Sequence, residues 1–167
     1  MNKSFLLFLA LGLGIVAAYL SLTFTVTKDS HLRLDGKIRN VRIAPLPGSG
    51  GATLVVLDVR LSNPTKVQFV TGSAFIQIEP DSGKPVKAET MSKPELDSVI
   101  PYLPQIGPRL TDLFGPQDKI APHQSFDRTL GARIELAEDA ITSRKGLVLL
   151  LEDVDGAVLE IRDEKAR

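Results

Sequence analysis

An uncharged stretch near the start of the chain constrains its architecture more than any other feature. No charged residue occurs from Ser4 to Thr27, and Phe5–Phe24 supplies a long, predominantly apolar run. An α-helix of about 20 such residues spans the ~30 Å hydrocarbon core of a bilayer. We therefore expect residues 1–28 to form one N-terminal transmembrane helix and residues 29–167 to fold on one side of the membrane.

A retained anchor and a cleaved secretion signal are the two main alternatives for this run, with a buried core helix as a third. Signal peptides combine an apolar core of about 7–15 residues with a small-residue cleavage site. Here the run is longer, and Tyr19 follows Ala17 and Ala18 without an Ala-x-Ala pattern. We favour the retained anchor. Lys3 and the short N-terminal tail favour an extracytoplasmic C-terminal domain, periplasmic in a Gram-negative cell.

Composition limits what the remaining ~140 residues can do, although that length suffices for one domain with its own core. The chain has no cysteine, which excludes disulfides and thiolate metal sites. It carries 20 basic and 20 acidic residues and no Trp. A neutral chain with no Trp and only two Tyr gives no sign of a nucleic-acid partner.

Alternation with period 2 dominates this part of the sequence and predicts strands. In Thr53–Ser62 one row is apolar, whereas the opposite row changes from Leu54 and Val56 to polar residues. We expect Gly72 to shift the phase of the next strand and Gly36 to mark a bulge or bend. The predicted core consists of Val55, Leu57, Val59, Leu61, Ile76, Ile78, Leu130, Ile134, Leu149, Leu151 and Leu159.

About seven strands separated by turn residues predict a mainly β fold, an antiparallel immunoglobulin-like β-sandwich with a short helical insert. A small barrel is the alternative, because it produces the same alternation. We expect the helical segment to lie at a crossover between the two sheets.

The insert, residues 91–115, breaks the strand pattern. Ser92 and Glu95 form a capping-box sequence, and Leu96 and Val99 follow at helical spacing. Prolines at 101, 104 and 108 prevent one long helix and deny the segment a regular ladder. Long connections in compact domains are often functional.

Four apolar residues of the insert are the candidate partner-binding residues: Tyr102, Leu103, Ile106 and Phe114. We expect them to contact a partner or to cap one end of the sandwich, and to stay out of the core between the sheets.

The stretch Ala52–Pro80 followed by Asp-Ser-Gly-Lys resembles extracytoplasmic sandwiches of the late-embryogenesis/WHy and FxLYD types. Those domains have an apolar strand ending in Asn-Pro, as at Asn63-Pro64, and a later Ile-x-Pro-x-x-Ser lead-in, as at Ile120–Ser125. Thr65 departs from the second Asn often seen in the WHy pattern. The resemblance implies a fold more than a function, because the roles of such domains are mostly accessory or unassigned.

Catalytic and metal-binding patterns are weak. His123, Ser125 and Asp127 share one face of a strand, but side chains two residues apart lie ~6.5–7 Å from each other. A nucleophile and its base need contacts of about 2.6–3.2 Å. His31 and His123 are the only histidines, and nothing in the sequence brings them together. We predict no catalytic residue, no metal site and no cofactor.

These observations favour a non-enzymatic, membrane-anchored accessory or partner-binding module of a cell-envelope assembly. The expected partners are the membrane and an envelope protein. The alternative is a secreted protein that binds a small or hydrophobic ligand after its signal is removed.

Overall fold

The computed structural model describes residues 12–14, 16 and 34–163. Within those residues it holds no helix that is both long enough and apolar enough to cross a membrane. The predicted anchor at residues 1–28 lies almost entirely outside the described part. His31 also lies outside it.

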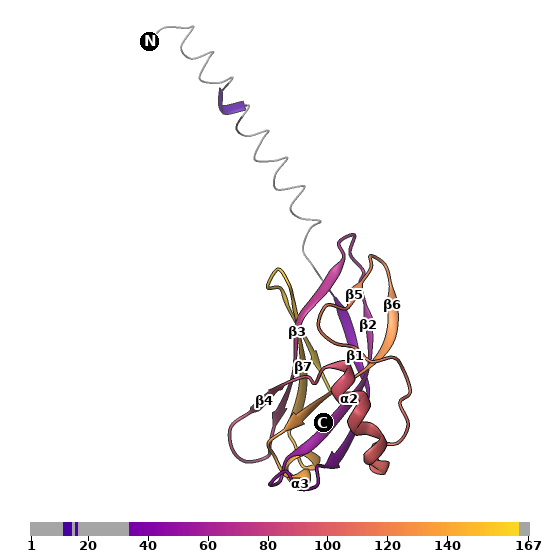
Figure 1. Ribbon diagram of the computed structural model, residues 1–167. Helices are drawn as coiled ribbons and strands as arrows, with labels where there is room; N and C mark the ends of the chain where they lie inside the picture. Colours follow the sequence, from indigo (N-terminus) through magenta and orange to yellow (C-terminus); the bar gives the residue numbers. More distant parts are fainter. Residues whose placement is uncertain (1–11, 15, 17–33, 164–167) are drawn as a thin grey trace, which may run out of the picture.

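The described chain is mainly β, with antiparallel ladders and few helices (Figure 1). Its elements, in order, are β1 (Asp35–Pro45), β2 (Thr53–Ser62), β3 (Phe69–Glu79), β4 (Val86–Glu89), α2 (Lys93–Val99), the 3-10 turns η1 (Ile100–Tyr102) and η2 (Pro104–Ile106), β5 (Lys119–Ile120), β6 (Ser125–Ile134), α3 (Glu138–Thr142), β7 (Gly146–Asp153) and β8 (Val158–Arg162).

The ladders form two sheets that pack against each other. The first has the order β1-β2-β6, and the second has the order β4-β3-β7-β8 with β5 paired to the start of β3. The chain crosses between them after β4, where Thr90 N–H donates to Ala74 in β3 and Met91 N–H donates to Gly131 in β6. The insert therefore lies at a crossover between the sheets, as predicted.

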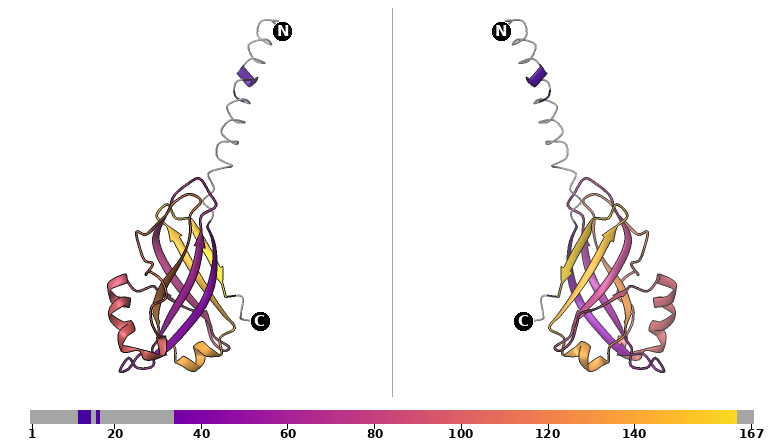
Figure 2. Two further views of the ribbon diagram at one scale, coloured as in Figure 1. Left: turned by 90° about the vertical axis from the view of Figure 1, so that its right-hand side faces the viewer. Right: turned by 90° about the vertical axis from the view of Figure 1, so that its left-hand side faces the viewer.

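The main core lies between the two sheets. Ten of the eleven predicted core residues are buried in it, and the eleventh, Leu159, is partly buried against it. The short helix α3 closes one end of this core (Figure 2), with Ile141 fully buried. The connection between β6 and β7 thus contributes to the core.

One of the two predicted irregularities at glycines is present in the strand register. The β3–β7 ladder shifts between Thr71 and Ser73, so the phase change predicted at Gly72 is confirmed. The bulge predicted at Gly36 is wrong, because Gly36 pairs regularly with Leu61 and the irregularity lies between Ile38 and Asn40. At Gly36 an added Cβ would lie 2.1 Å from Ile161 Cδ1, so Ile161 packs directly on the glycine and would have to shift for any larger residue.

Strand β2 is buried on both faces. Its inward row belongs to the main core, while Leu54 and Val56 in the opposite row are also fully buried. The insert covers these residues from outside and so forms a third layer over the β1-β2-β6 sheet (Figure 2).

Candidate functional site

The insert packs on the sheet through a second apolar cluster, separate from the main core. Ala44, Leu54 and Val56 supply the floor of this cluster from β1 and β2. The insert supplies the cover, namely Leu96, Ile100, Leu103, Ile106 and Leu113. The apolar half of the outer row of β2 is therefore covered.

Gly131 in β6 allows α2 to approach the sheet closely. A Cβ at this position would lie 2.9 Å from Leu96 Cδ1 and 3.2 Å from the carbonyl oxygen of Val55. A contact below about 3 Å requires one of the two groups to move. Here the Leu96 side chain is buried and the Val55 carbonyl is part of the backbone of β2, so neither has much room to move. The glycine thus sets the depth at which α2 rests.

The helix α2 begins with part of the predicted capping box. The backbone N–H and the hydroxyl of Ser92 both donate to Glu95 Oε2, at 2.9 and 2.7 Å. These bonds stabilise the carboxylate and hold the pKa of Glu95 below its ordinary value of 4.5. The capping sequence therefore orders the start of the insert.

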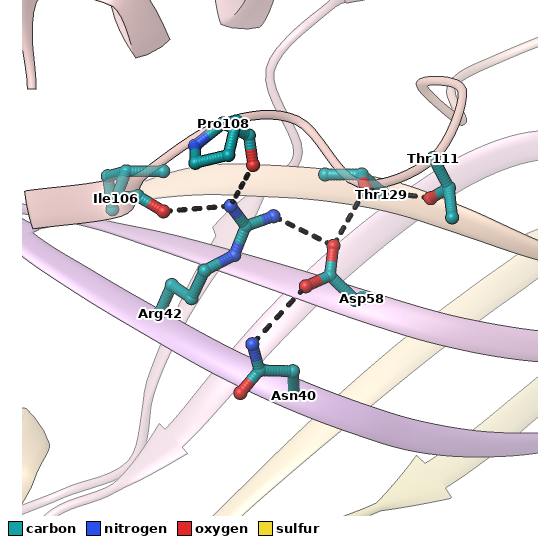
Figure 3. Close-up of polar contacts among 7 residues, drawn as sticks. All are labelled: Asn40, Arg42, Asp58, Ile106, Pro108, Thr111 and Thr129. Atoms are coloured by element: carbon teal, nitrogen blue, oxygen red, sulfur yellow. Dashed lines mark hydrogen bonds and ion pairs between the residues drawn. The ribbon is translucent and has the colours of Figure 1, made fainter. Parts of the chain in front are cut away.

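A polar cluster holds the middle of the insert to the sheet (Figure 3). Arg42 Nη1 in β1 donates to the carbonyl oxygens of Ile106 and Pro108, at 2.8 and 3.0 Å. Its Nη2 donates to Asp58 Oδ1 in β2 at 2.8 Å, and both side chains are about nine-tenths buried. We call this group, with the threonines and asparagine described next, the Arg42–Asp58 cluster.

Neighbouring strands complete the coordination of Asp58. Thr129 Oγ1 in β6 donates to Asp58 Oδ1 at 2.7 Å and lies 2.9 Å from Thr111 Oγ1 in the insert. Asn40 Nδ2 approaches Asp58 Oδ2 at 3.5 Å. Three strands and the insert thus meet at one carboxylate.

The cluster solves a hydrogen-bonding problem created by the prolines. The segment around residues 106–108 lacks a ladder, yet its carbonyl groups lie against the sheet, where unpaired polar groups are costly. The two donors on Arg42 Nη1 pair both carbonyls. Farther along, Leu113 forms a parallel bridge with Thr129, which fixes the end of the insert to β6.

The four predicted partner-binding residues separate into three environments. Leu103 and Ile106 lie together in the second cluster, 4% and 1% exposed. Tyr102 is 83% exposed. Phe114 is buried in the main core, with its ring centroid 6.3 Å from that of Phe126.

Two expectations about these residues are therefore wrong. Phe114 was expected to stay out of the core between the sheets, but it follows the bridge at Leu113 and turns inward. End-capping is one of the two roles predicted for these residues, but the insert covers a face of the sheet, because Leu54 and Val56 leave an apolar strip there. The element that closes an end is α3 (Figure 2), whose Ile141 is buried in the main core.

Sequence reasoning missed Arg42, Asp58 and Thr129 as the residues that position the insert. A signal for Asp58 was present, since it is a charged residue in the centre of a largely apolar strand. Arg42 and Thr129 carry no comparable signal, because an exposed polar row on either strand would have the same sequence.

The outer side of the insert borders two open hollows. One of about 500 Å³ is lined mainly by apolar groups of the 3-10 turns, including Ile100, Pro101, Leu103, Pro104 and Pro108. The other, of about 650 Å³, lies between α2, residues 109–114 and β6, and its rim is charged.

Ion pairs account for the rim of the larger hollow. Lys93 pairs with Asp118 at 2.5 Å, Arg109 with Asp97 at 2.9 Å, and Arg128 lies 3.9 Å from Asp112 and over the ring of Phe126. Each of these three cations thus faces a carboxylate, and Lys119 adds a fourth cation to the lining of the hollow.

The residues considered for catalysis have other partners. Ser125 Oγ donates to Ser62 Oγ at 2.6 Å, and Asp127 lies 3.9 Å from Arg60. These contacts cross the ladder to β2 and do not involve His123. Within the described part of the chain, no three His, Asp or Glu side chains could share a metal ion.

Comparison with known proteins identifies no family. No protein-family model matches the chain, and no curated protein matches it. The resemblance to the late-embryogenesis/WHy and FxLYD types thus has no matching family model behind it.

Two solved structures are similar at a low level. One, described as the X-ray structure of Northeast Structural Genomics Consortium target SoR45, has a TM-score of 0.37 and 11% identity, covering 81% of this chain and 84% of that chain. The other, the putative ApaA protein from Bordetella pertussis, has a TM-score of 0.36 and 13% identity, covering 79% of this chain and 89% of that chain. Similarities this low carry no conclusion about function.

Proposed function

We propose that this protein is a membrane-anchored, extracytoplasmic, non-enzymatic module that binds a protein partner of a cell-envelope assembly through the outer side of its insert. The observation that carries the proposal is the two-sided character of the insert. Its inner side is fixed to the sheet by an apolar cluster and by the Arg42–Asp58 cluster, while its outer side presents Tyr102 and Leu110 to solvent.

Rigidity supports a binding role. A connection without a ladder would lose conformational entropy on binding, and a surface ordered in advance avoids that cost. Here Arg42 and the bridge at Leu113 fix the insert at two points, and prolines at 101, 104 and 108 restrict the backbone that leads into the Arg42 contacts.

The exposed side chains suit a protein partner. Tyr102 and Leu110 are 83% and 62% exposed, and each is next in sequence to a residue that lines the apolar hollow of about 500 Å³. Tyrosine is enriched among residues that dominate binding energy at interfaces. The neighbouring ion pairs Arg109–Asp97 and Arg128–Asp112 provide a polar rim.

Membrane attachment and fold type complete the proposal. The sequence of residues 1–28 supports a retained single-span anchor, and the orientation follows from Lys3 and the short N-terminal tail. For the fold, we propose an immunoglobulin-like sandwich of the kind that the late-embryogenesis/WHy and FxLYD resemblance implies. Its support is the pair of antiparallel sheets joined by a crossover at the insert.

One observation favours a second candidate, a secreted protein that binds a small or hydrophobic ligand. The hollow beside Ile100 and Leu103 is lined mainly by apolar groups, as ligand sites are. It is open to solvent, however, and so would leave much of a ligand uncovered. The protein-binding proposal accounts better for a shallow surface beside an exposed tyrosine.

Site-specific photocrosslinking in cells tests the proposal. A benzophenone amino acid replaces Tyr102 in the full chain, and a matched variant carries it at Glu160, an exposed position on β8 in the other sheet. We expect a discrete crosslinked protein from position 102 and none from position 160. No protein crosslink at 102, or the same products from both positions, would contradict a partner surface on the insert. Native mass spectrometry that finds a bound small molecule instead would support the second candidate.

A further inference from the structure

One end of the sandwich carries three exposed valines. Val154 and Val158 are each 60% exposed, and Val67 is 39% exposed. Val67 lies in the connection from β2 to β3, Val154 lies in the turn between β7 and β8, and Val158 is the first residue of β8. We call these three residues the valine tip.

Backbone contacts place the valine tip at a single end. Val154 N–H donates to the carbonyl oxygen of Val70 at 3.0 Å, which joins the β7–β8 turn to the start of β3. Val158 pairs with Glu152 across the same hairpin. In Figure 1 these loops gather at the upper end of the domain, while α3 and the start of β4 lie toward the other end.

The first strand begins at this same end. Asp35 in β1 pairs with Ser62, the last residue of β2, just before the loop that holds Val67. Only nine residues, 25–33, separate the apolar run ending at Phe24 from Leu34. Fully extended, they reach about 30 Å.

The opposite end lies much farther along the molecule. Strand β3 has 11 residues and runs the length of the domain. At about 3.3 Å per residue, β3 places the opposite end of the domain ~35 Å farther from the start of β1. If Phe24 is at the membrane surface, the valine tip is the end of the domain that its tether keeps near the lipid.

We propose that the valine tip rests on the lipid surface and inserts its side chains into the headgroup region, which fixes the domain upright on its anchor. The inference rests on the proposed membrane anchor. Exposed valines scattered singly would need no explanation, but these three gather at the tethered end. Lys66 and Asp155, both exposed and next to these valines in sequence, have opposite charges, and Lys119 is exposed on the strand that pairs with Val70. We expect the apolar side chains to make the contact in neutral lipid.

Labelling in vesicles tests the contact directly, because the chain contains no cysteine. Single-cysteine variants Val67→Cys, Val154→Cys and Ser82→Cys of the full-length protein are labelled with an environment-sensitive fluorophore. They are then reconstituted into phosphatidylcholine vesicles with or without a shallow lipid-attached quencher. Ser82 is exposed in the β3–β4 turn at the far end and serves as the matched control.

We expect labels at 67 and 154 to shift their emission to shorter wavelength and lose roughly half of it to the quencher, since interfacial groups sit about 5–10 Å into the headgroup boundary. The label at 82 should keep its emission. Full-length protein that does not float with the vesicles would overturn the anchor and the contact together.

Protein that floats, but whose 154 label behaves like the 82 label, would overturn the lipid contact alone. Shielding of position 154 from an aqueous quencher without lipid quenching would show that another protein surface, such as a second copy of the chain, covers the tip, and would also overturn the lipid contact. Thermal melting of each variant checks that the labelled domain is folded.

Discussion

Arg42 and Asp58 lie on adjacent strands and share a 2.8 Å ion pair, yet the arginine also donates to two carbonyl groups of a segment more than 60 residues away. The pair therefore joins the sheet to the insert. The pair holds the insert in place, because one guanidinium bonds both to the Asp58 carboxylate and to two carbonyl groups that belong to no strand ladder.

We expect Asp58→Ala to lower the free energy of unfolding by about 3 kcal/mol, because removing one partner leaves a largely buried charge uncompensated. Arg42→Ala should have a similar effect. The double variant should lose less stability than the sum of the losses of the two single variants. Denaturant melts measure all three.

The exposed pair Arg60 and Asp127, 3.9 Å apart, is the control. Alanine at either of its positions should change stability by about 1 kcal/mol or less. Equal losses at the two pairs would contradict a special role for the buried one.

Gly131→Ala should destabilise the protein by about 1–3 kcal/mol, because the new methyl group overlaps the Leu96 side chain. Combining it with Leu96→Ala should cost less than the sum of the single changes, since truncation of Leu96 makes space. Gly115→Ala is the matched control, with its nearest contact at 3.5 Å. Additive losses at 131 and 96 would show that the two residues do not meet.

Leu57→Ala should cost about 2–5 kcal/mol, as expected for a leucine with no exposed surface. The same change at Leu110, which is 62% exposed, should leave the melting temperature nearly unchanged. A Leu57→Ala domain that melts with the parent would mean that the register of β2 is wrong.

The contribution of Glu95 should depend on pH. Since its pKa in the folded protein is lowered below 4.5, its carboxylate contributes stability above that value and loses it as the pH falls through the folded pKa. Glu95→Gln should therefore be less stable than the parent at neutral pH, and the difference should shrink on acidification. If the stability difference between the variant and the parent grew as the pH fell, the pKa of Glu95 could not be lowered in the folded protein.

We expect the apolar N-terminal run to remain in the mature protein. N-terminal sequencing of the chain extracted from membranes measures this directly. A mature chain that begins near Thr25 would contradict the anchor and favour the secreted alternative.

The strands and the main core could be predicted because burial between two sheets imposes period 2 on the sequence. The alternation around Leu57 and the phase change at Gly72 required no knowledge of what lay outside the sheets. The position of the insert could not be derived in this way. Leu54 and Val56 form an apolar strip, but a strip does not specify which segment covers it.

The candidate site was predictable only as a segment. Prolines and apolar residues indicated that residues 91–115 were unusual, but the choice of inner and outer side chains depended on contacts distant in sequence. Phe114 illustrates the difficulty. Its inward direction follows from the bridge between Leu113 and Thr129, and that pairing has no local sequence signal.

The Arg42–Asp58 cluster also bears on the order of folding. Its members come from β1, β2 and β6, and Asp58 and Thr129 are 71 residues apart. A nascent chain that has not yet paired β6 with β2 lacks Thr129 at the cluster and the glycine on which Leu96 rests. The insert therefore gains its complete set of contacts only when that long-range pairing has formed. A partner that recognises the docked insert would therefore bind completed molecules and pass over unfinished ones.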